Sequence, residues 1–127
     1  MTSASPYKPV YDEIMRVCPS SVGVFQGPSQ MMLPSMLARD LANHLLELYR
    51  MGHVEEFPSL SIQIEKFYQL PDAKLREWAT LGLLEAIQSV WSATEVDPQT
   101  FRRYLMSQSL RDWDRLAAFW STGTRNY

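Results

Sequence analysis

Two histidines and a group of glutamates in the middle of the chain are the residues best able to carry chemistry. His44 and Glu47 lie three positions apart and so share one face of a helix, and His53, Glu55 and Glu56 follow closely. Imidazole and carboxylate groups are common metal ligands. However, neither the HExxH motif of zinc enzymes nor the paired ExxH motifs of di-iron bundles occurs. We therefore predict no metal and no cofactor, and expect His44 to be a half-buried histidine beside a leucine stripe.

Covalent and acid–base catalysis find equally little support in the sequence. Cys18 is the only cysteine, which excludes an intramolecular disulfide and a thiolate cluster within one chain. It belongs to no recognisable nucleophile motif, so we expect a small buried side chain. The phosphate-binding patterns GxxxxGK[ST] and GxGxxG are absent, and the spacing of the glutamates selects no acid–base pair. The sequence predicts that the protein is not an enzyme.

Length and composition predict one folded domain. The chain has 127 residues, 46% of them hydrophobic and 20% charged, which excludes intrinsic disorder. We expect a single helical domain over 1–127, with residues 1–6 as a loose N-terminal tail. We find neither a signal peptide nor the run of about eighteen apolar residues that spans a membrane. With its single cysteine, the protein is expected in the cytoplasm.

The charge balance indicates the kind of partner. Twelve basic and fourteen acidic side chains give a formal net charge of −2, which argues against binding nucleic acid. Residues 40–65 contain five acidic side chains and one arginine, whereas residues 98–127 contain five arginines and two aspartates. Such a division is consistent with steering toward a charged partner, and it also occurs in proteins that bind nothing.

Hydrophobic spacing close to 3.6 residues predicts an all-α fold. Prolines, aspartates and glycines divide the chain into about six helices, which should form a single-domain bundle resembling a short stack of helix pairs. The β-like run SVGVF at 21–25 is interpreted as part of a long loop over 19–33. The expected helices cover residues 9–18, 34–51, 58–70, 72–92, 98–105 and 107–122.

The helix over 72–92 has the strongest pattern and is expected to be central. Its Ala79, Gly82 and Ala86 form a strip of small residues that would let another helix approach closely. The tryptophans follow helical stripes and are expected in the core: Trp78, Trp91, Trp113 and Trp120.

Three stretches carry a resemblance to a known family. They are HLLELYRMGHVEEFP at 44–58, REWATLGLLEAIQSV at 76–90 and WDRLAAFW at 113–120. Together they resemble a bacterial family of small, uncharacterised helical proteins with the patterns HLxELYxxGxxEEFP, RExATxGLLExIQ and WxxLxxFW. The resemblance covers about residues 33–121. Relatives tend to be acidic where residues 19–33 of this chain are rich in glycine, serine and proline.

Proteins of this family look similar in size and style to immunity proteins, which neutralise a cognate bacterial toxin by direct binding. The resemblance therefore implies a stoichiometric inhibitor that needs no cofactor. The lack of a signal peptide predicts that its toxin acts in the cytosol. If the 19–33 loop contacts the partner, the specificity of this chain should differ from that of its relatives.

We predict a protein-binding surface at the turn between the second and third helices. Glu47, Glu55 and Glu56 have no evident cationic partner nearby in the sequence, and unneutralised acids at a helix–helix corner are typical of a recognition surface. The alternative is that these glutamates only keep the protein soluble and favour the start of the third helix. The predicted partner-binding residues are Glu47, His53, Glu55 and Glu56.

Two other functions stay open. A ligand-binding or enzymatic domain would need a pocket near His44 in which an acid also converges. A structural subunit would instead present the Ala79, Gly82 and Ala86 strip on its surface and oligomerise through it.

Overall fold

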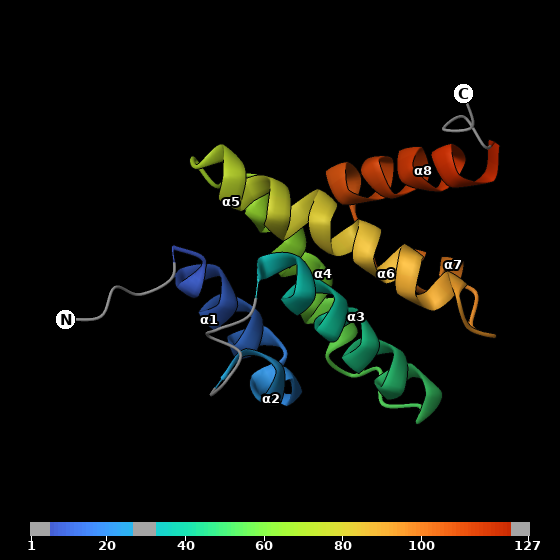
Figure 1. The fold of residues 1–127 in the computed structure, drawn as a ribbon, viewed down its shortest axis with the longest axis horizontal. Helices are drawn as coiled ribbons and strands as arrows, with labels where there is room; N and C mark the ends of the chain where they lie inside the picture. The colour runs from blue at the N-terminus through green and yellow to red at the C-terminus, as the bar shows by residue number, and fades with distance from the viewer. Residues whose placement is uncertain (1–5, 27–32, 123–127) are drawn as a thin grey trace.

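The computed structural model describes residues 6–26 and 33–122 as a bundle of helices with no strand among them. The predicted all-α class is therefore confirmed. Figure 1 shows the order of the elements along the chain. They are α1 (Lys8–Val17), the 3₁₀ turn η1 (Pro19–Ser21), α2 (Val22–Phe25), α3 (Pro34–Arg50), α4 (Phe57–Phe67), α5 (Ala73–Glu77), the π-helical segment η3 (Trp78–Gly82), α6 (Leu83–Ser92), α7 (Gln99–Arg102) and α8 (Ser107–Thr122).

Most helices begin where the sequence places a proline or an aspartate. Pro34 and Pro58 occupy the first turns of α3 and α4, where a missing N–H costs nothing. Asp72 caps α5, since its Oδ1 accepts a hydrogen bond from the Leu75 N–H at 3.0 Å. Asp97 Oδ1 likewise accepts from the Gln99 N–H at 2.9 Å at the start of α7. These predicted boundaries are confirmed.

The predicted loop over 19–33 is wrong for residues 19–25, which form η1 and α2. The carbonyl of Cys18 accepts from both the N–H of Ser21 (2.8 Å) and its hydroxyl (2.7 Å), which closes the first turn. Phe25 is buried with its ring centroid 4.9 Å from that of Tyr11. Helical winding buries this ring, and that outweighs the β propensity of the valines. The rest of the predicted loop at 27–32, and all of the predicted tail except Pro6, lie outside the described residues.

The predicted helix over 72–92 is one continuous rod with a wider turn inside it (Figure 1). We call α5, η3 and α6 together the central rod. Within it the Thr80 hydroxyl donates to the Arg76 carbonyl at 2.7 Å. Side-chain bonds of this kind compete with the regular helical pattern, and η3 has the five-residue spacing of a π-helix.

The strip of small residues lies on a rod that other helices contact. α3 packs along α6, and α3, α4 and α8 each contact η3. The nearest atoms that a Cβ at Gly82 would meet belong to Glu77 and Trp78 of its own rod, at 3.6 Å or more. Ala79 and Ala86 are buried in the core. The strip therefore offers no surface for the oligomerisation that it suggested.

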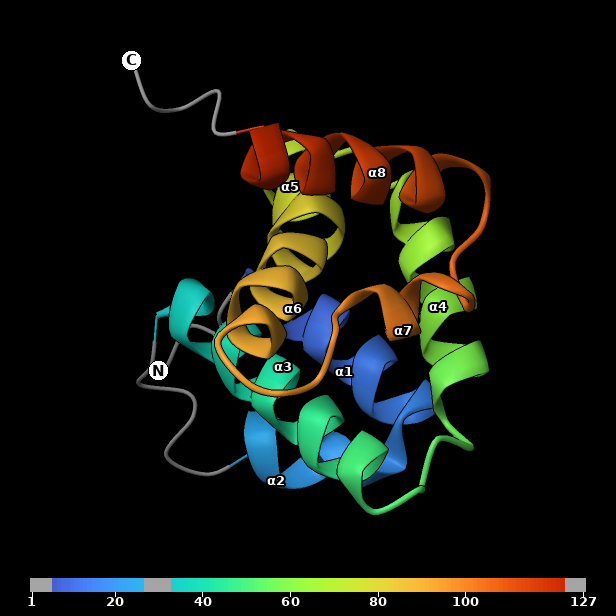
Figure 2. The ribbon, with the colours of Figure 1, turned by 90° about the vertical axis from the view of Figure 1, so that its right-hand side faces the viewer.

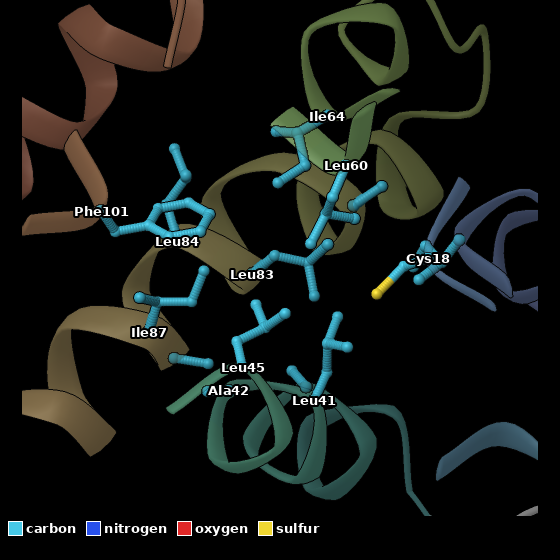
Figure 3. Packing of buried hydrophobic residues seen from close by; sticks show 14 of the residues in the cluster. Cys18, Leu41, Ala42, Leu45, Leu60, Ile64, Leu83, Leu84, Ile87 and Phe101 are labelled. Atoms are coloured by element: carbon cyan, nitrogen blue, oxygen red, sulfur yellow. The ribbon is translucent and has the colours of Figure 1, made fainter. Parts of the chain in front are cut away.

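The core lies between α3, α4 and the central rod. Figure 3 shows the leucine stripe of α3, including Leu41 and Leu45, facing Leu60 and Leu83. All four side chains are almost completely buried, and each contributes roughly 1.5–3 kcal/mol through the hydrophobic effect. The core position of the tryptophans is confirmed for Trp78, Trp91 and Trp113, whereas the side chain of Trp120 lies outside the described set.

α8 lies across α4 and the central rod, at the opposite end of the molecule from α1 and α2 (Figures 1 and 2). Glu65 of α4 accepts three hydrogen bonds from the start of α8: from the Gln108 N–H (3.0 Å), the Ser109 N–H (3.1 Å) and the Ser109 hydroxyl (2.9 Å). Burial alone would raise the pKa of Glu65, but these hydrogen bonds outweigh it and lower the pKa. A carboxylate on one helix thus caps another.

Replacing Glu65 with alanine should therefore lower the free energy of unfolding by about 2 kcal/mol, because two backbone N–H groups lose their acceptor. Urea denaturation at pH 7 measures this loss, with Glu85→Ala on the exposed face of α6 as the matched control. Folding lowers the pKa of Glu65. Its contribution to the free energy of unfolding is therefore fully present at a pH above the usual pKa of a glutamate, and it is lost as the pH falls through the lowered pKa. An equal loss in both variants would contradict the capping role.

Candidate functional site

The turn between α3 and α4 is held by backbone hydrogen bonds that require a glycine. The His53 N–H donates to the Leu48 carbonyl at 2.8 Å, and the Gly52 N–H donates to the Tyr49 carbonyl at 3.0 Å. These two bonds form the Schellman motif at a helix C-terminus. Gly52 has a φ of 77°, the left-handed conformation in which a Cβ is unfavourable. The predicted glycine cap is confirmed.

Glu47 does have a cationic partner, so the sequence-based interpretation of this residue was wrong. Arg50, one helical turn further on, places Nη1 3.3 Å from Glu47 Oε2. The same guanidinium makes two hydrogen bonds to Glu95, at 2.9 and 3.0 Å, from the segment after α6. Arg50 therefore lies between two carboxylates and links α3 to the end of the central rod.

His53 and Glu55 are exposed at the turn itself. His53 Nδ1 lies 3.9 Å from Glu55 Oε2, and the Glu55 side chain is 76% exposed. Beside them is Met51, an apolar side chain that is 58% exposed. We call Glu47, Met51, His53 and Glu55 the α3–α4 corner. It joins three of the four predicted partner-binding residues to a methionine that the sequence analysis did not single out.

Glu56, the fourth predicted residue, belongs to a different site. Its Oε1 accepts the Ser20 hydroxyl at 2.7 Å and, at 3.4 Å, the Ser20 N–H. The Ser20 Oγ also lies 2.7 Å from His44 Nε2. We call Ser20, His44 and Glu56 the Ser20 clasp, because they join the segment after α1 to α3 and to the start of α4.

The directions of these hydrogen bonds fix the proton positions. The Ser20 hydroxyl gives its proton to the carboxylate, so its oxygen must accept from His44, whose Nε2 then carries a hydrogen. Burial would raise the pKa of Glu56, but hydrogen bonds from Cys18 and Ser20 outweigh it and lower the pKa. Burial first, and then the hydrogen bond to Glu56, raise the pKa of the Cys18 thiol to about 12, so Cys18 is buried and protonated at neutral pH.

The Ser20 clasp differs from a nucleophilic serine site. A catalytic serine gives its proton to a histidine that a carboxylate orients. Here the Ser20 hydroxyl donates its hydrogen to Glu56 and its oxygen accepts from His44, so both atoms of the hydroxyl are hydrogen-bonded. The arrangement is suited to holding three segments together.

Within 6–26 and 33–122 no group of three or more His, Cys, Asp or Glu side chains is placed to hold a metal ion. In the same ranges no helix combines the length and the apolar character needed to cross a bilayer.

A family described as a domain of unknown function, DUF7674, matches residues 11–121. The chain belongs to this family. The DUF7674 match includes the three stretches that carried the sequence resemblance and also most of α1, so it spans both the α3–α4 corner and the Ser20 clasp. No curated protein and no solved structure matches the chain.

Sequence reasoning missed Ser20 because its partners are distant in the chain, 24 and 36 positions away. The convergence of His44 with an acid was considered, but the acid could not be identified. Met51 had a usable signal, since it directly follows the last turn of an amphipathic helix and precedes a glycine cap.

Replacing Gly52 with alanine should lower the free energy of unfolding by about 1 kcal/mol, because the left-handed conformation at this position disfavours a Cβ. The matched control is Gly23→Ala in α2, where an added Cβ meets nothing within 4 Å and the backbone is helical. This control should be neutral or slightly stabilising. Thermal or urea unfolding of the two variants measures the difference, and equal stabilities would contradict the role of Gly52.

Proposed function

We propose that the protein is a non-catalytic protein-binding module of the immunity type, which neutralises a cognate bacterial toxin in the cytoplasm by stoichiometric binding. The observation that carries the proposal is the exposed Met51 side chain at a hydrogen-bonded turn whose neighbouring positions in the sequence include the exposed His53 and Glu55. An apolar side chain with a charged rim is the arrangement found at the centre of many protein interfaces. The toxin-immunity assignment is supported by the sequence resemblance alone.

The corner needs little reorganisation to bind. The Schellman bonds fix its backbone, and Arg50 makes ion pairs with Glu47 of the corner and with Glu95. A preformed surface loses less conformational entropy on association than a flexible loop. Of the two carboxylates of the corner, Glu55 has the more exposed side chain, and among the residues that the structure describes its ion-pair partner is His53, which is charged only when protonated. Glu55 therefore favours a partner with a basic surface.

The test is an affinity capture from the native lysate with the tagged protein and two variants. Met51→Asp and Glu55→Lys should each reduce the retention of a stoichiometric partner by about tenfold or more. Met36→Asp is the matched control, since Met36 is also exposed but lies about 22 Å away along α3 at about 1.5 Å per residue. Glu56 must be left unchanged because it belongs to the Ser20 clasp.

Toxicity provides the second half of this test. The captured partner should arrest growth when it is expressed alone, and co-expression of the wild-type protein, but not of Met51→Asp, should restore growth. If all variants retain the partner equally, the α3–α4 corner is not the binding surface. If the captured partner is not toxic, the proposal that the protein binds a partner stands and the immunity assignment is rejected.

A further inference from the structure

We draw no further inference here: the strongest candidate, the acidic turn over residues 93–97 that the Arg50–Glu95 ion pair ties to the α3–α4 corner, extends the site already described, and nothing among the described residues shows what covers it.

Discussion

The reversal of the chain at Gly52 determines the position of everything that follows it. α3 and α4 each bury an apolar face against the central rod, so the chain must turn back within a few residues without exposing the end of α3. The left-handed glycine and its two backbone hydrogen bonds achieve this, and they leave the residues around the turn on the surface. Burial of the leucine stripe thus leaves Met51, His53 and Glu55 exposed at the α3–α4 corner.

The acidic residues of the middle of the chain have separate roles in the structure. Glu65 caps α8, Glu56 accepts from Ser20, and Glu47 shares Arg50 with Glu95. Glu65, Glu56 and Glu95 therefore each connect segments that are distant in sequence, whereas Glu47 pairs with Arg50 within α3. Of the two carboxylates of the corner, Glu55 has the more exposed side chain.

The helices of the core could be predicted from the sequence because they depend on local signals. The Leu41 and Leu45 stripe, the cap at Asp72 and the glycine at 52 each act within a few residues. The site could be predicted only in part. His53 and Glu55 were correctly placed on the surface, whereas the role of Glu56 depends on a serine 36 positions away. Helix α2 was missed because its formation depends on burying Phe25 against Tyr11, a tertiary contact.

The His44 ring holds the N-terminal segment by donating from Nε2 to Ser20, and Glu56 accepts from the same hydroxyl and so serves the fold. Two-dimensional ¹H–¹⁵N NMR of the imidazole rings tests this most directly, because the chain has only two histidines. We predict the Nε2–H tautomer for His44 at neutral pH, a pKa lowered below 6.5 by burial, and loss of the tautomer preference in Ser20→Ala. An Nδ1–H tautomer, or a ring that is insensitive to the serine, would contradict it.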